Sequence, residues 1–249
     1  DKDGWTPMLY ACQKGHLDIV QFLFENGAKD DAIVATKKDG WTPMFYACNY
    51  GYLNIVQFLF GNSPKQDICQ PNNSGTTLIN RACYRGHLNV VLFLLTQDCA
   101  AEDVQQPNKQ GATPMLCSAE MGHLDIVRLL FEHGASVRQA KNDGKTPLLS
   151  ACINGHLDIV QFLFQNGAKD DVCRADNMGW TPMFAACRKD RLDIVQFLFQ
   201  NGATDDVKRP TNDGWTPMAI ACSKGYLDIA QFIFQNGAKD DVRQPFNDG

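Results

Sequence analysis

The stretch DGWTPMAIACSKGYLDIAQFIFQNGA, residues 213–238, decides the fold. Asp213-Gly214 is a turn signal, and Thr216-Pro217 marks a helix start. The Thr hydroxyl can cap orphan N–H groups, and Pro at the first helical position gives up a donor that has no partner there. The pattern predicts one helix over 217–224, ended by Gly225, and a second over 227–235.

The same unit returns along the whole chain, at spacings of 33 to 36 residues. Each copy reads as turn, helix, tight turn, helix and long polar loop, such as Lys239–Asn247. Helices shorter than about 12 residues are marginal in water, so the copies must stack and bury one another's apolar sides. The repeat therefore predicts a solenoid. Its capping threonines are Thr6, Thr42, Thr77, Thr113, Thr146, Thr181 and Thr216.

We expect one domain over residues 1–249 that contains seven repeats. Their approximate bounds are 3–38, 39–73, 74–109, 110–142, 143–177, 178–212 and 213–247.

The units resemble the ankyrin repeat family. The resemblance implies an all-α solenoid with short β-hairpin fingers, and a concave partner-binding face lined by the fingers and the first helices. The His that follows Thr-Pro-Leu in the family is absent, and Leu9, Phe45, Asn80, Leu116, Leu149, Phe184 and Ala219 stand there. The family pattern is carried, in one repeat, by Gly144, Thr146, Pro147, Leu148, Ala151, Cys152, Gly155, His156, Val160, Leu163, Phe164, Gly167 and Ala168.

Some repeats depart from the pattern. Ser63 and Asp98 replace the Gly after the second helix, Leu78 replaces a Pro, and Asp190-Arg191 replaces Gly-His. Asp enters the left-handed backbone region less readily than Gly. We therefore expect residues 61–108 to be the least regular segment. Hydrogen exchange should show a dip in protection there, and uniform protection would contradict this.

Composition excludes several classes of protein. The net charge of −5 argues against a general nucleic-acid binder. No apolar run reaches about 18 residues, so no membrane insertion is expected. No signal peptide is visible, although the chain begins at Asp1. Neither end carries a polar capping repeat, so we expect a piece of a longer array, whose uncapped ends would permit self-association.

Six of the ten cysteines occupy one repeat position: Cys12, Cys48, Cys83, Cys152, Cys187 and Cys222. Ala119 fills that position in repeat four, so we expect these cysteines to be small buried apolar groups. Cys69, Cys99, Cys117 and Cys173 are scattered and form no C-x-x-C pair. Ten reduced thiols would indicate an intracellular, cytoplasmic location.

No residue pattern points to catalysis. His16, His87, His123 and His156 occupy the Gly-His turn, which is structural in the family that the chain resembles, and Tyr52 and Tyr226 replace the His in two repeats. Phosphate-binding and nucleophile motifs are missing. We expect no enzyme activity, no cofactor and no metal.

Candidate binding residues lie where the repeats differ. Aromatic side chains are favoured interface anchors, although each Trp could instead only pack on its neighbouring finger. Basic residues gather near the ends of the first helices and could form a stripe for an acidic partner. The predicted partner-binding residues are Trp5, Tyr10, Trp41, Tyr46, Tyr50, Arg81, Tyr84, Arg85, Arg188, Lys189, Trp180 and Trp215.

The sequence therefore favours a non-enzymatic scaffold that binds another protein on the concave face. Two alternatives stay open: a permanent structural subunit of a large assembly, and a regulatory ankyrin segment of a longer enzyme or channel. Nucleic acid is a disfavoured partner.

Overall fold

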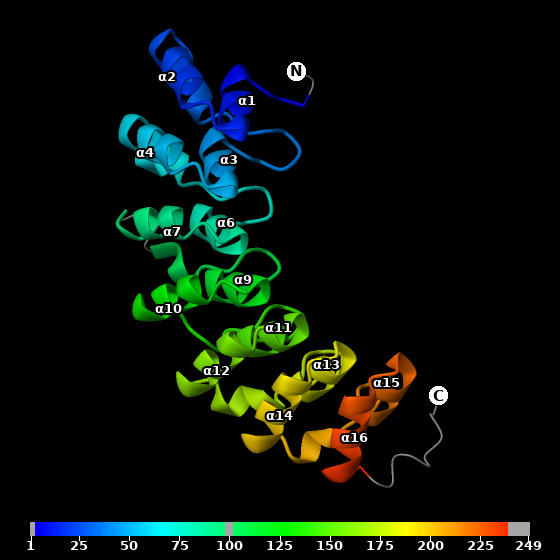
Figure 1. The fold of residues 1–249 in the computed structure, drawn as a ribbon. Helices are drawn as coiled ribbons and strands as arrows, with labels where there is room; N and C mark the ends of the chain where they lie inside the picture. Colours follow the sequence, from blue (N-terminus) through cyan, green and yellow to red (C-terminus); the bar gives the residue numbers. More distant parts are fainter. Residues whose placement is uncertain (1–2, 98–101, 239–249) are drawn as a thin grey trace. The chain divides into compact units, whose positions relative to one another are not determined.

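The computed structural model describes residues 3–97 and 102–238. In this part of the chain seven pairs of short helices follow one another (Figure 1), and no residue lies in a β-strand. The pairs are α1 (Pro7–Lys14) and α2 (Leu17–Glu25), α3 (Pro43–Tyr50) and α4 (Leu53–Asn62), α6 (Leu78–Arg85) and α7 (Leu88–Leu95), α9 (Pro114–Met121) and α10 (Leu124–Glu132), α11 (Pro147–Asn154) and α12 (Leu157–Gln165), α13 (Pro182–Arg188) and α14 (Leu192–Gln200), and α15 (Pro217–Lys224) and α16 (Leu227–Gln235).

Shorter helices lie in the loops that join the pairs. They are η1 (Asp30–Ala32), α5 (Lys65–Ile68), η2 (Glu102–Gln105), η3 (Lys169–Cys173) and η4 (Asp205–Val207).

Threonine caps begin the first helices as the sequence indicates. The Thr146 hydroxyl accepts a hydrogen bond from the Leu149 N–H at 3.1 Å. Thr77 caps α6 in the same way, although Leu78 stands where other repeats have Pro. The two helices predicted over 217–224 and 227–235 are confirmed.

The chain divides into two compact units. Unit 1 comprises residues 1–118 and 125–135, and unit 2 comprises residues 119–124 and 136–249. In unit 1, α1 packs on α3 and α3 packs on α6; in unit 2, α11 packs on α13 and α13 packs on α15. The single domain and the repeat bounds stay predictions.

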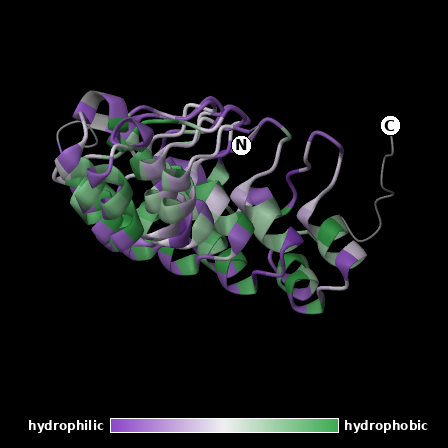
Figure 2. Ribbon diagram, turned by 90° about the horizontal axis from the view of Figure 1, so that it is seen from above, coloured by the Kyte–Doolittle hydropathy of each residue, from purple (hydrophilic) through white to green (hydrophobic). Residues whose placement is uncertain are grey.

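Phenylalanine pairs join successive second helices in both units. Phe24 and Phe58 meet edge-on at 5.5 Å between ring centroids, and Phe164 and Phe197 do so at the same distance. Edge-to-face contacts of this kind add to the free energy of apolar burial. Figure 2 shows hydrophobic residues concentrated on the helices, whereas the long connecting loops are mostly hydrophilic.

The fingers are turns, not β-hairpins, in the described residues. At one turn, the Asp176 N–H donates to the Trp180 carbonyl at 3.1 Å, and the Trp180 N–H donates to Asp176 Oδ1 at 2.9 Å. Neighbouring turns are also joined, because the Asn177 N–H donates to the Asp143 carbonyl at 2.9 Å. A single backbone bond between successive turns does not make a strand ladder.

The cysteine prediction is confirmed at five of its six positions and wrong at the sixth. Cys12, Cys48, Cys83, Cys152 and Cys187 are buried, whereas Cys222 is exposed. The expectation of ten free thiols is also wrong, because Cys69 is disulfide-bonded. Cys99 lies outside the described residues. The intracellular location stays a prediction, and the disulfide removes part of its basis.

Two of the turn histidines, His87 and His156, pack on a glycine of the preceding repeat. Gly51 has a φ of 77°, and a Cβ there would lie 2.5 Å from the His87 ring. His87 Nε2 is also 2.9 Å from the Asn49 carbonyl oxygen. His156 approaches Gly122 in the same way. These contacts agree with a structural role for the turn histidine.

The irregular repeats keep their helices with altered ends. Ser63 ends α4 in an extended conformation, and the additional helix α5 follows. Asp190 adopts a φ of 56°, which places a non-glycine residue in the left-handed region. Asp98 lies outside the described residues, and the low regularity of 61–108 stays a prediction.

Candidate partner-binding surface

An aromatic cluster lies on the first helices of unit 1. The Trp5 ring lies 4.8 Å from the Tyr10 ring and 5.1 Å from the Tyr46 ring, and Trp41 lies 4.9 Å from Tyr46. Tyr46 is therefore enclosed between two tryptophans and is only 6% exposed, whereas Tyr10 is 49% exposed. Burial, together with Asp39 and Tyr50, raises the pKa of Tyr46 to about 12. Its phenol stays neutral at physiological pH.

Arg81 of α6 extends the aromatic cluster. Its guanidinium lies 4.7 Å from the Trp41 ring centroid and 5.4 Å from that of Tyr84, which are cation–π distances. Tyr84 in turn packs on Ala112, Leu116 and Cys117. We call the set Trp5, Tyr10, Trp41, Tyr46, Arg81 and Tyr84 the aromatic–arginine surface.

A buried asparagine of α3 orients two arginines of α6. Asn49 Oδ1 accepts hydrogen bonds from Arg81 Nε at 2.7 Å and from Arg85 Nε at 2.9 Å, and Asn49 is only 2% exposed. Burial lowers the pKa of Arg81, and the charge of Arg85 lowers it further. Arginine nevertheless stays charged in proteins. This role of Asn49 was not predicted from the sequence.

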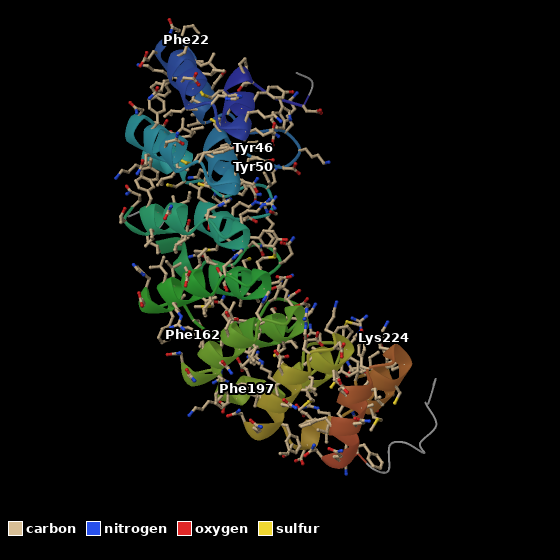
Figure 3. All side chains as sticks on the ribbon, viewed as in Figure 1. Phe22, Tyr46, Tyr50, Phe162, Phe197 and Lys224 are labelled. Atoms are coloured by element: carbon tan, nitrogen blue, oxygen red, sulfur yellow. The ribbon has the colours of Figure 1, made fainter. Side chains whose placement is uncertain are left out.

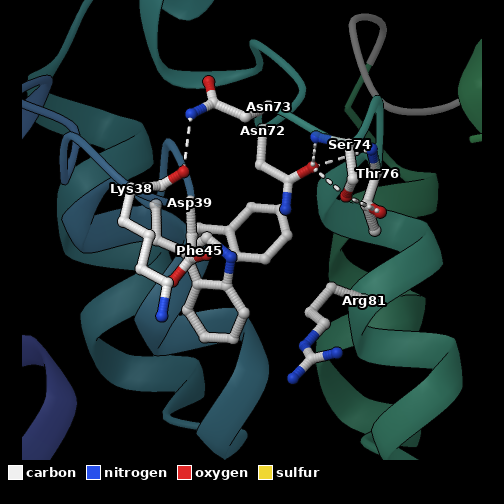
Figure 4. Close-up of a pocket in the computed structure, with 9 residues that line it drawn as sticks. Lys38, Asp39, Phe45, Asn72, Asn73, Ser74, Thr76 and Arg81 are labelled. Carbon is white, nitrogen blue, oxygen red and sulfur yellow. Dashed lines mark hydrogen bonds between the residues drawn. The ribbon is translucent and has the colours of Figure 1, made fainter. Parts of the chain in front are cut away.

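A hollow of about 440 Å³ adjoins Arg81 in unit 1. Figure 4 shows the Arg81 guanidinium beside it, with Asn72 and Ser74 on the turn above. Asn72 Oδ1 accepts from the backbone N–H groups of Ser74 and Thr76 at 3.1 and 2.9 Å, so the turn is held in place. The residues that line the hollow are Lys38, Asp39, Trp41, Phe45, Asn72, Asn73, Ser74, Thr76 and Arg81.

Two more predicted residues of unit 1 are open to solvent. Tyr50 follows Tyr46 by one turn of α3 (Figure 3) and is 43% exposed, with its ring stacked on Tyr52 at 6.1 Å. Arg85 is also exposed. Eight of the twelve predicted binding residues thus lie in unit 1.

The other four predicted residues lie in unit 2. The Arg188 guanidinium covers the Trp180 ring at 4.6 Å, and Phe184 lies 5.4 Å from the same ring. Lys189 is exposed and Trp215 is half-buried. In unit 2 the Trp–Arg contact lies within one repeat. In unit 1 the contacts of this kind connect three successive first helices, α1, α3 and α6.

Unit 2 also holds aspartates that the sequence analysis did not single out as sites. Asp171 is fully buried, and its Oδ1 lies 3.2 Å from Arg138 Nη2 and 3.7 Å from Arg174 Nη1. Asp206 is buried with Oδ1 3.6 Å from Arg209 Nη1. Burial raises the pKa of both carboxyl groups, and the arginines partly oppose this. These are internal ion pairs of the loops.

The buried thiols are unsuited to nucleophilic chemistry. Burial raises the pKa of Cys12 to about 12, and it raises the pKa of Cys48 as well. Only the thiolate is a good nucleophile. Within residues 3–97 and 102–238, no group of three or more His, Cys, Asp or Glu side chains could hold a metal ion.

A family model described as ankyrin repeats (3 copies) matches the chain in overlapping stretches: 1–72, 30–107, 62–141, 79–176, 135–209 and 169–244. This chain belongs to the ankyrin repeat family. No curated protein matches it. Ankyrin repeats are in general protein–protein interaction modules and are typically non-enzymatic. Throughout the described part of this ankyrin array, every helix is too short or too polar to cross a membrane.

Proposed function

We propose that this ankyrin array is a non-enzymatic scaffold, and that unit 1 binds another protein through the aromatic–arginine surface. The supporting observation is the continuity of aromatic and arginine contacts from Trp5 across α1, α3 and α6 to Tyr84. Trp, Tyr and Arg are the residues that most often dominate binding energy at interfaces. Tyr10 of this surface is exposed, and so are Tyr50 and Arg85, which lie on the same helices α3 and α6 as Tyr46 and Arg81.

The surface is largely ordered before binding. Tyr46 is held between two tryptophans, and Arg81 is held by Asn49 and Trp41. Side chains that are already fixed lose little conformational entropy when a partner binds. This favours a preformed site over one that orders on binding.

The test is a quantitative affinity purification from the native source with three full-length baits. One is wild type, and one carries Tyr10→Ala, Tyr50→Ala and Arg85→Ala, which remove exposed contacts and leave the buried Tyr46 intact. The control carries Phe22→Ala, Leu92→Ala and Lys65→Ala, which alter exposed residues outside the first helices. Thermal melts of all three check folding.

A protein retained by the wild type and the control but lost with the Tyr10–Tyr50–Arg85 variant supports the proposal. A protein retained equally by all three baits would place binding elsewhere on the array.

A further inference from the structure

Two guanidinium groups of unit 1 meet without a carboxylate. Arg81 and Arg85 donate their Nε–H groups to the same atom, Asn49 Oδ1, which brings the two like charges together. Among the described residues, neither arginine forms a salt bridge, and the Nη atoms of both make no hydrogen bond. Each guanidinium therefore keeps its Nη–H donors for a ligand.

Charge compensation elsewhere in the array makes this pair distinctive. The salt bridges made by Arg138, Lys145, Arg174 and Arg209 lie in unit 2. Arg138, Arg174 and Arg209 each face a buried aspartate there. The position of Asn49, by contrast, supplies Arg81 and Arg85 with a neutral acceptor. The fold thus pairs arginines with carboxylates in one unit and leaves a pair unneutralised in the other.

The surroundings of the pair fit a peptide chain. The adjoining hollow is lined by the aromatic rings of Trp41 and Phe45 and by the polar side chains of Asp39, Asn72 and Asn73. An apolar side chain can lie against the aromatic wall, and the polar groups can pair with peptide N–H and C=O groups. The carboxylate of Asp39 in the same lining disfavours a polyanion such as nucleic acid.

We infer that the partner of unit 1 presents an acidic peptide segment, in which an Asp or Glu carboxylate binds the Nη groups of Arg81 and Arg85 and a neighbouring apolar residue contacts Trp41. This deepens the proposed function and rests on it. Carboxylate–guanidinium bonds are charge-assisted and geometrically specific, so the pair would select the acidic residue as well as attract it.

The test uses a random dodecapeptide display library, selected on the full-length wild-type chain at low ionic strength. We expect enriched peptides to contain Asp or Glu next to an apolar residue. The affinity of one such peptide should fall about ten- to one-hundred-fold when its acidic residue is replaced by the matching amide. It should fall similarly with Arg85→Gln, which is exposed and does not threaten the fold, and with Arg81→Gln, but not with the control Lys65→Gln.

Three results would overturn the inference. They are enrichment of peptides without acidic residues, indifference of binding to both arginine variants, and tighter binding when phosphoserine replaces the acidic residue, which would assign the site to phosphate. The tyrosine variants distinguish failure of this inference from failure of the proposed function. If neutral peptides bind and Tyr10→Ala with Tyr50→Ala abolishes their binding, unit 1 still binds protein and only the acidic preference is refuted. If no enriched peptide responds to the tyrosine variants, the surface itself is refuted.

Discussion

The first helices of the two units share a backbone design but carry different side chains. At one repeat position unit 1 has two tyrosines and an arginine, whereas unit 2 has no aromatic or charged residue there. The residues are Tyr10, Tyr46, Arg81 and Cys117 in unit 1, and Ser150, Ala185 and Ile220 in unit 2. The loops of unit 2, in turn, carry buried aspartates that are paired with arginines. The repeated core positions are common to both units, and we propose that the variable positions set the binding chemistry.

The largest expected effect tests whether the scaffold is common to both units. Phe45 in unit 1 and Phe184 in unit 2 are both buried and both pack on the Trp of their own repeat. Phe45→Ala and Phe184→Ala should each reduce the free energy of unfolding by about 3–5 kcal/mol, measured by urea denaturation. Losses that differ by more than about 2 kcal/mol would contradict a shared core.

A smaller effect separates two turns of the same conformation. Gly51 and Gly225 both have positive φ, of 77° and 74°. A Cβ would meet the His87 ring at Gly51 but nothing within 4 Å at Gly225. Gly225→Ala should cost about 1–2 kcal/mol from the backbone alone, and Gly51→Ala should cost more because the ring must move. Equal melting temperatures for the two variants would refute the close packing of His87 on Gly51.

The next effect concerns the buried carboxylates of unit 2. Burial raises the pKa of Asp206, although Arg209 and Cys173 lower it. The folded state therefore binds this proton more tightly than the unfolded state. Protonated Asp206 therefore contributes to the free energy of unfolding. This contribution is fully present below the ordinary Asp pKa of about 3.9, and it is lost as the pH rises through the higher pKa of Asp206 in the folded state.

Asp206→Asn removes this titration, so the variant should gain stability relative to wild type as pH rises from about 3 to 7. Chemical denaturation at a series of pH values measures the difference. Asp205→Asn, which makes the same change at the exposed neighbour, is the matched control. A constant difference between Asp206→Asn and wild type would contradict the raised pKa.

The smallest effect is on thiol reactivity. Burial raises the pKa of Cys187, whereas Cys222 at the same repeat position is exposed. A thiol-specific reagent at mildly alkaline pH should modify Cys222 in the native chain well before Cys187, as mass spectrometry would show. Simultaneous modification of both would mean that the fold does not protect the repeat position.

The sequence predicts the helices well because their signals are local. The Thr cap, the Pro after it and the turn Gly lie within about ten residues of one another, and both helices expected over 217–235 form as expected. Cys222 escaped the prediction because its exposure depends on tertiary packing, which a local repeat pattern does not reveal. The disulfide of Cys69 escaped as well, because cysteine spacing alone does not reveal which thiols the fold brings together.

The contacts among the candidate binding residues were predicted only in part. Within-chain variation pointed to Tyr10, Tyr50, Arg81 and Arg85, but it could not show that Tyr46 is buried. The contact of both arginines with Asn49 also escaped, because it joins residues 32 and 36 positions apart. Whether these residues bind a partner stays a prediction.

The most direct test gives Arg81 and Arg85 of unit 1 a carboxylate partner, as the arginines of unit 2 have. Asn49→Asp changes one buried amide to a carboxylate of the same shape, at the atom that both Nε–H groups already contact. We expect the variant to be folded by circular dichroism and thermal melting, and to bind an acidic peptide about ten-fold more weakly by fluorescence anisotropy. Unchanged affinity in a folded variant would contradict the claim that the unneutralised arginines of unit 1 recognise the partner.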